Sequence, residues 1–243
     1  FTIAKYVTDI SKPKRAAIRE LAKLSNIEIA GIHWVLAQTE GLHLTHPDVE
    51  IRRRTTNYLS ELVDFCADLG GKVIVVGSPK QRQVLPEVSS DQAWDWATAC
   101  FREPAMKAEQ RAVTICFEPL SPAETNFINT AQEAIRFAEQ LHTPHFKIIL
   151  DVKAMSSEEK SIPEIIRSAS PHFAHFHAND KNLKGPGFGE VDFKPIAAAL
   201  KEVRYTGFVS VEVFNFDEGP EIIARGSLEY LQHAFAFEAS ASA

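Results

Sequence analysis

Runs of apolar, β-branched residues alternate along the chain with stretches in which apolar residues recur every three or four positions. The first pattern predicts strands and the second predicts helices. The predicted strands lie within residues 1–8, 27–36, 72–79, 113–120, 146–154, 172–180 and 208–214. The predicted helices follow them, within residues 11–25, 47–69, 89–110, 130–142, 162–170, 192–204 and 218–235. The chain therefore consists of seven strand–helix units.

Local signals support several of these helix boundaries. Pro13 suits the first turn of a helix, since its fixed φ angle is compatible with that position. Asp48 is a good N-cap, and Gly70 is typical of a helix end. Pro104 lies inside a helical stretch, where we expect it to break or kink the helix.

Apolar strands that are joined by helical crossovers predict a parallel sheet covered on both faces. A doubly wound open sheet and a closed barrel both have this pattern. The four last predicted strands each deliver a polar side chain at the same end, and consecutive strands stay adjacent in a barrel. The expected fold is therefore α/β, a TIM (β/α)8 barrel forming a single domain over residues 1–243. Since only seven units are visible, we expect the first strand and helix to precede Phe1.

Composition restricts the classes of partner. Hydrophobic residues make up 45% of the chain and charged residues 24%, which is ordinary for a globular protein. The net charge of −6 gives no reason to expect nucleic acid or an anionic membrane as a partner. No apolar run approaches the roughly 18 residues of a membrane span. Three cysteines without metal-ligand spacing indicate buried thiols in a reducing compartment, and we expect a cytoplasmic protein.

Four potential metal ligands end four successive predicted strands: Glu118, Asp151, His177 and Glu212. A single acidic residue at a strand end is usually a helix cap or a loop residue. Four in succession favour a site, because the carboxyl ends of parallel strands meet at one edge. Carboxylate and imidazole ligands without thiolate suit Mn, Mg, Co or Zn as the cofactor.

Residues near these strand ends are candidates for substrate binding. Side chains alternate along a strand, so Lys153 faces the same side as Asp151 and can reach the pocket. His33 ends an early strand and can touch a substrate, whereas Trp34 alternates to the other face and is expected to pack. His43 lies in a loop that can cover the pocket. Arg82 follows another strand and can approach an anionic group.

The segments FEPLSPAE, LDVKA, HFHAND and VEVF resemble motifs of the xylose-isomerase-like TIM-barrel family, in particular its D-tagatose 3-epimerase branch. That family takes its metal ligands from the ends of its last four strands in the order Glu, Asp, His, Glu. The separations here are 33, 26 and 35 residues, which are similar to the epimerase pattern. The resemblance covers nearly the whole chain.

The resemblance implies an activity and roles for the residues. A divalent cation holds the carbonyl and adjacent hydroxyl oxygens of a ketose and stabilises an enediolate. The two glutamates, Glu118 and Glu212, would be the acid and base on opposite faces of that sugar. Glu124 matches a substrate-binding glutamate of the family. The expected partner is a small carbohydrate, and family members are often homo-oligomers.

The chain departs from the family pattern at two positions. Ala154 stands where the epimerases and the related endonuclease IV carry a histidine, and Leu183 stands where the epimerases carry an arginine. Lys181 and Lys184 can supply the missing donors. These changes indicate a substrate other than a plain free ketohexose. They also argue against DNA repair, because the ligands for a trinuclear zinc site are missing.

Two alternatives to an isomerase or epimerase remain at this stage. A metal-dependent lyase or dehydratase acting on a keto-sugar, keto-glycoside or keto-inositol would form the same enediolate and then expel a leaving group. A barrel that binds a metal or sugar without catalysis belongs to a different class. The pair of glutamates argues against it, since binding alone needs no second base.

Overall fold

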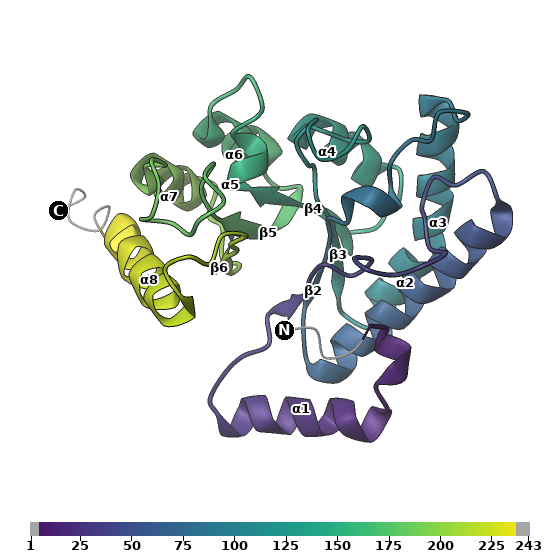
Figure 1. Cartoon of the computed structure of the whole chain (residues 1–243), viewed down its shortest axis with the longest axis horizontal. Coiled ribbons are helices and arrows are strands. Elements are labelled where there is room, and N and C mark those ends of the chain that lie inside the picture. The colour runs from purple at the N-terminus through teal and green to yellow at the C-terminus, as the bar shows by residue number, and fades with distance from the viewer. Residues whose placement is uncertain (1–4, 237–243) are drawn as a thin grey trace.

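The computed structural model describes residues 5–236 and contains a parallel sheet of six strands (Figure 1). Each strand pairs with the next one along the chain, as the barrel interpretation requires. The strands are β1 (Gly31–Ile32), β2 (Val73–Val76), β3 (Thr114–Phe117), β4 (Phe146–Asp151), β5 (Phe173–Ala178) and β6 (Val209–Val211). Consecutive parallel pairing confirms a TIM-barrel arrangement. Within residues 5–236 the sheet forms a half-barrel whose edges are β1 and β6.

Helices cross between the strands and surround the sheet (Figure 1). They are α1 (Lys12–Leu24), α2 (Val49–Leu69), α3 (Ser90–Gln110), α4 (Ala131–Glu139), α5 (Val152–Met155), α6 (Ile162–Ala169), α7 (Phe193–Glu202) and α8 (Pro220–Ala236). Short 3-10 turns occur at Val7–Asp9 and Pro79–Gln81. Asp48 caps α2 by accepting from Glu50 N, and Gly70 ends that helix at φ 87°, as the sequence predicted. Across residues 5–236, no helix combines the length and the apolar character that a membrane crossing requires.

Two of the predicted strands differ from the structure. The first predicted strand falls partly on residues 1–4, which lie outside the described residues. Its remainder is a bend followed by a 3-10 turn, because the Arg15 guanidinium binds the carbonyl oxygens of Val7 and Ile10. The second predicted strand is only two residues long, since Trp34 adopts a left-handed backbone with φ 57°.

Pro104 does not break its helix, where a break or a kink was expected. α3 runs continuously through it. A proline inside a helix removes one backbone hydrogen bond, but here tertiary burial compensates. Phe101 and Ala105 on the same helix are almost completely buried against the core.

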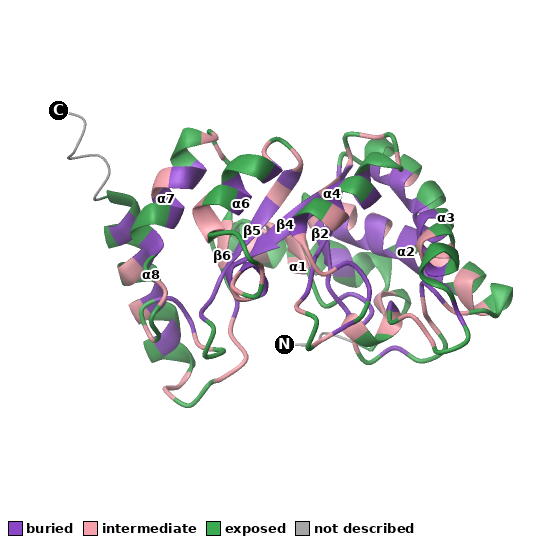
Figure 2. Cartoon of the chain, turned by 90° about the horizontal axis from the view of Figure 1, so that it is seen from above, coloured by how far each residue is buried: buried purple, intermediate pink, exposed green. Residues whose placement is uncertain are grey.

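The core lies between the strands and the inner faces of the helices (Figure 2). Its aromatic part joins α3, β3, α4 and β4 through edge-on and tilted ring contacts. The ring centroids of Phe101 and Phe146 are 5.0 Å apart, and those of Phe117 and Phe137 are 4.9 Å apart. Such pairs add to the area that they bury. This packing fixes the end of β3, the strand that carries Glu118.

Candidate metal centre

The four candidate ligands meet at the carboxyl edge of the sheet. Asp151 and His177 are register partners on neighbouring strands β4 and β5. Glu118 and Glu212 each follow the last residue of a flanking strand, β3 and β6. One ligand atom from each of the four residues lies within 4.8 Å of the others. The predicted convergence of these side chains is therefore present in the structure.

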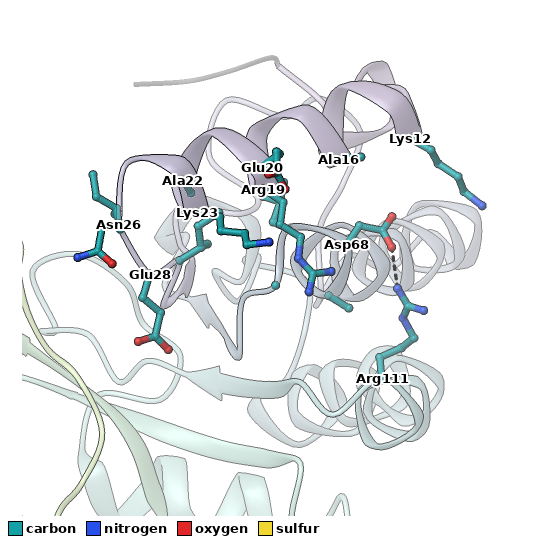
Figure 3. Close-up of a pocket in the computed structure, with 15 residues that line it drawn as sticks. Lys12, Ala16, Arg19, Glu20, Ala22, Lys23, Asn26, Glu28, Asp68 and Arg111 are labelled. Atoms are coloured by element: carbon teal, nitrogen blue, oxygen red, sulfur yellow. Dashed lines mark hydrogen bonds and ion pairs between the residues drawn. The ribbon is translucent and has the colours of Figure 1, made fainter.

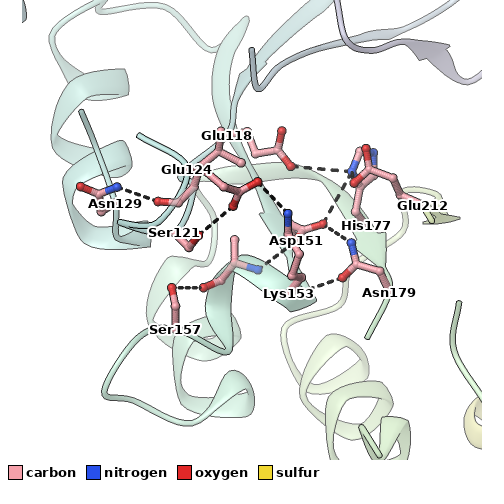
Figure 4. Close-up of polar contacts among 12 residues, drawn as sticks. Glu118, Ser121, Glu124, Asn129, Asp151, Lys153, Ser157, His177, Asn179 and Glu212 are labelled. Atoms are coloured by element: carbon pink, nitrogen blue, oxygen red, sulfur yellow. Dashed lines mark hydrogen bonds and ion pairs between the residues drawn. The ribbon is translucent and has the colours of Figure 1, made fainter. Parts of the chain in front are cut away.

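The imidazole of His177 lies at the centre of this group (Figure 4). Its Nδ1 atom is 3.1 Å from Glu212 Oε2, 3.8 Å from Glu118 Oε1 and 3.9 Å from Asp151 Oδ2. All four residues are buried, with exposed fractions between 1% and 8%. Three carboxylates and one imidazole are thus withdrawn from water at one point.

Asn179 orients the Asp151 carboxylate. Its Nδ2 donates to Asp151 Oδ2 at 2.6 Å, while the backbone N–H of Ala154 donates to Oδ1 at 2.8 Å. Asn179 Oδ1 accepts in turn from Lys153 N at 2.8 Å. Hydrogen bonds of this kind fix a ligating carboxylate. The sequence reasoning missed this residue, although period-two alternation places Asn179 on the same face as His177.

Arg82 holds the backbone of Glu118 in place. Its side chain is completely buried, donates to the Glu118 carbonyl oxygen at 2.5 Å and lies over the Phe117 ring at 4.7 Å. Arg82 was expected to approach an anionic group, but the hydrogen bond from its guanidinium goes to this neutral backbone carbonyl. Gly77 leaves room for the Glu118 carboxylate, since a Cβ atom at Gly77 would lie 2.0 Å from Oε2.

Burial gives the site a strong proton affinity. It raises the pKa of Glu118 to about 8, and the neighbouring Asp151 charge adds to this effect. Burial likewise raises the pKa of Asp151 to about 6, assisted by Glu212. Like charges at this separation cannot all ionise without a compensating cation. The carboxylates therefore accept either a proton or a metal ion.

His177 and Glu212 favour each other's charged forms, in contrast to Glu118 and Asp151. Burial disfavours the imidazolium, but the hydrogen bond to Glu212 and the surrounding carboxylates raise the pKa of His177. Burial alone would raise the pKa of Glu212. The hydrogen bonds and charges of His177 and His33 outweigh it and hold that pKa far below its usual range.

These donors fit a divalent cation. Oxygen and imidazole ligands without thiolate suit Mn, Mg, Co or Zn. No other cationic side chain among the described residues lies within ion-pair distance of the Asp151 carboxylate. A bound divalent ion would offset the negative charge that burial makes unfavourable.

A cavity of about 450 Å³ opens beside the metal-ligand candidates. It is lined by Glu118, Asp151, Glu212, Glu124, Lys153 and residues of the loops after β1 and β2. Lys153 Nζ donates to Glu124 Oε1 at 2.7 Å, and the Ser121 hydroxyl donates to Glu124 Oε2 at 2.8 Å. The structure therefore brings two predicted substrate contacts, Glu124 and Lys153, to the cavity wall. Lys153 reaches it from helix α5 and not from a strand, since β4 ends at Asp151, so the predicted strand alternation does not apply to it.

The other predicted contacts lie elsewhere. His33 is half-exposed beside the quartet, with Nδ1 3.5 Å from Glu212 Oε1. His43 is held in its loop, where its Nδ1 accepts from Thr45 N at 3.3 Å, and it does not line the cavity. Lys181 is exposed and does not line the cavity either. Neither Lys181 nor His43 is therefore in place to contact a sugar there.

Two aromatic residues at the cavity were misjudged or missed. Trp34 was expected to pack, but its side chain is 52% exposed and lines the cavity together with Phe214. The strand ends at Ile32, so Trp34 lies beyond it and does not follow the side-chain period of two. Phe214 stands two residues beyond Glu212, a spacing that could have signalled the same face.

A larger open groove lies beneath α1 and carries none of the candidate ligands (Figure 3). Its volume is about 1310 Å³, and its walls come from α1, the end of α2 and Arg111. The Arg111 guanidinium is paired with Asp68 at 2.7 Å. Scattered surface charges of this kind converge on no common point, so the smaller cavity is the candidate site.

Comparison with known proteins agrees with this geometry. The family model of the xylose isomerase-like TIM barrel matches residues 2–234. A D-psicose 3-epimerase of Ruminiclostridium cellulolyticum is 32% identical over 174 residues, which cover 71% of this chain and 59% of that relative. A D-psicose 3-epimerase of Enterocloster bolteae is 26% identical over 247 residues, which cover 93% of this chain and 81% of the relative. The match thus spans less than two thirds of the first relative's length.

Solved structures agree on the fold. A crystal structure of a D-psicose 3-epimerase in the presence of D-fructose has a TM-score of 0.82 and 23% identity, covering 94% of this chain and 86% of that chain. At this identity the likeness concerns the fold alone. Since the family model covers nearly all of its length, the chain belongs to the xylose isomerase-like TIM barrel family.

Proposed function

We propose that this protein is a divalent-metal-dependent epimerase of a ketose or ketose derivative. The observation that carries the proposal is the pair of glutamates, Glu118 and Glu212, at two sides of one buried carboxylate–imidazole group beside a cavity. They directly follow β3 and β6, with β4 and β5 between these strands. The relatives named as ketose 3-epimerases support the same activity.

The proposed metal ligands are Glu118, Asp151, His177 and Glu212, and Mn²⁺ is the proposed ion, with Mg²⁺, Co²⁺ or Zn²⁺ as substitutes. When bound, such an ion polarises a carbonyl group and stabilises the negative charge that develops on it. Asn179 and the Ala154 N–H hold Asp151 in one orientation for this role.

The two glutamates lie on either side of Asp151 and His177, with strands β4 and β5 between them. Glu212 is the proposed base that removes the proton next to the carbonyl group, and its contacts with His177 and Trp34 favour the ionised carboxylate. Glu118, on the other side, is the proposed acid that gives a proton to the opposite face of the resulting enediolate. Proton return to the other face inverts that carbon and gives the epimer.

Lys153 and Glu124 are the proposed contacts for sugar hydroxyl groups. Their ion pair lines the cavity and offers both donors and acceptors. His33 contacts Glu212 rather than the cavity, so we assign it no direct substrate contact. His43 and Lys181 are left out of the proposal, because they lie away from the cavity wall.

A lyase would begin with the same proton removal and end with loss of a leaving group. Neither it nor a non-catalytic binding protein is favoured by the relatives, which are named as epimerases. The test is incubation of the protein and Mn²⁺ with a panel of ketoses and keto-glycosides in heavy water. Epimerisation gives a stereoisomer carrying deuterium at the inverted carbon. Release of water or an aglycone would support the lyase instead, and no conversion of any compound would contradict both enzymes.

We also propose a cytoplasmic location, a single domain and a homo-oligomeric state. Three free cysteines, all buried, are consistent with a reducing compartment. Fractionation of the source cells and light scattering of the purified protein would test the first and third proposals.

A further inference from the structure

Trp34 has an unusual backbone and an unusual position. It follows β1 directly after His33 and has φ 57°, a left-handed conformation that is rare for a bulky residue. Its side chain is 52% exposed although it is one of the largest in the chain. Strained residues persist where the surrounding structure holds them, and they cluster at functional sites. A tryptophan that only filled the core would need neither feature.

The indole of Trp34 is hydrogen-bonded to a proposed catalytic group. Nε1 donates to Glu212 Oε1 at 3.2 Å. The other carboxylate oxygen, Oε2, is the one that lies 3.1 Å from His177 Nδ1. The two oxygens of Glu212 thus have different partners: Oε1 accepts from Trp34 and lies 3.5 Å from His33 Nδ1, whereas Oε2 faces His177.

The face of the same ring forms part of the cavity. Trp34 and Phe214 are stacked with centroids 6.0 Å apart and planes inclined by 22°. Both line the cavity. Lys153 Nζ lies 4.5 Å from the centroid of Phe214. Trp34 and Phe214 therefore form an aromatic wall of the cavity, which extends from the Glu212 carboxylate to the Lys153–Glu124 pair.

We propose that Trp34 is a positioning residue that orients Glu212 through its indole N–H, and that its ring and Phe214 form a wall for the C–H face of the sugar. This inference rests on the proposed function. A sugar has both hydroxyl edges and apolar C–H faces, so an aromatic wall beside a polar pair matches its chemistry. A substrate that packs on this wall would also contact Trp34, the residue that is hydrogen-bonded to the proposed base Glu212.

The test compares three variants and measures Mn²⁺ affinity by calorimetry. Trp34→Phe keeps an aromatic ring and removes the donor. Trp94→Phe is the matched control, because it also removes an indole N–H, bonded to Gln140 Oε1 at 2.7 Å on the far helix α3. Loss of a partner that orients a ligating carboxylate typically weakens metal binding or activity by about 10–100-fold. We expect Trp34→Phe to weaken Mn²⁺ binding about tenfold and Trp94→Phe to leave it unchanged.

Phe214→Leu tests the wall separately. It should leave Mn²⁺ affinity unchanged and raise KM for the sugar that is turned over, whereas Trp34→Phe should mainly lower kcat. Unchanged Mn²⁺ affinity in Trp34→Phe would overturn the positioning role. Unchanged KM in Phe214→Leu would overturn the wall.

A fluorescence measurement covers the case in which Trp34→Phe does not fold. Replacing both Trp94 and Trp96 by Phe leaves Trp34 as the single tryptophan of the chain. Paramagnetic Mn²⁺ bound at the four ligands should then quench most of the emission, and emission unaffected by saturating Mn²⁺ would contradict the inference. Metal affinity and quenching need no turnover, so failure of the epimerase proposal is distinguishable from failure of this one.

Discussion

Replacing Glu118 by Gln should stabilise the metal-free protein at high pH while it removes metal binding. The carboxylate is 6% exposed, and burial together with the Asp151 charge raises its pKa to about 8 from 4.5. Because the folded-state pKa lies above the unfolded one, the folded protein holds the proton more tightly. Stability from this group is therefore fully present below about pH 4.5 and is lost as the pH rises through 8.

The size of the effect follows from the same shift. One pKa unit corresponds to about 1.4 kcal/mol, so the ionisation of Glu118 costs the metal-free wild type about 2–3 kcal/mol between about pH 6 and pH 9. A protein of this length changes its melting temperature by roughly 2–4 °C per kcal/mol, which gives a difference of roughly 5–10 °C. The neutral amide in Glu118→Gln carries no charge and avoids this loss.

The assay is thermal unfolding of both proteins in chelator across this pH range. The wild type should lose more stability towards high pH than Glu118→Gln does. Glu164→Gln is the control, because Glu164 is exposed and its pKa is lowered by hydrogen bonds from Ser161. It should show the wild-type loss. Mn²⁺ at 100 times its Kd should stabilise the wild type by about 2.7 kcal/mol and leave Glu118→Gln unchanged. Parallel pH curves for wild type and Glu118→Gln would refute the reasoning.

Three further outcomes are expected. Lys153→Met should raise the KM for the sugar roughly tenfold, because a charged hydrogen bond is lost, and should leave Mn²⁺ affinity unchanged. Lys181→Met is the control and should change neither quantity. Equal KM values for the two variants in steady-state kinetics would contradict the assignment of Lys153. Burial and the nearby His46 lower the pKa of His43 to about 4 from 6.5. The wild type should therefore lose stability as the pH falls from about 6.5 towards 4. Between about pH 7 and pH 5 the melting temperature of His43→Gln should drop less than that of the wild type. Burial raises the pKa of the three cysteine thiols, Cys66, Cys100 and Cys116, so none of them should react with a disulfide reagent in the native protein. A fast-reacting thiol would contradict this by placing one cysteine at the surface.

The sequence predicts well where the strands that carry the four ligands lie, because buried parallel strands are continuous apolar runs that the ligands follow or end. Asp151 and His177 come out as register partners for this reason. The convergence of four polar residues needs only that consecutive strands be neighbours. The alternation of strands and helices alone is compatible with a doubly wound sheet as well, and the polar residues at the ends of the four last strands are what favoured the barrel.

The rest depends on contacts between segments that lie far apart in the sequence. Arg82 binds the carbonyl oxygen of a residue 36 positions away, and Trp34 donates to one 178 positions away. No local pattern reports such pairs. The side-chain period of a strand also fails where the strand ends early, and β1 ends at Ile32. His43 was misplaced for a similar reason, since hydrogen bonds to Thr45 and Thr55 fix its loop away from the cavity.

The central claim is that Glu212 removes a proton from a ketose at this metal centre. The most direct measurement is the exchange of that sugar proton with heavy water, followed by NMR, for wild type and Glu212→Gln at Mn²⁺ concentrations that saturate each protein. The wild type should incorporate deuterium at the carbon next to the carbonyl group, and Glu212→Gln should not. Equal exchange by the two proteins would contradict the claim.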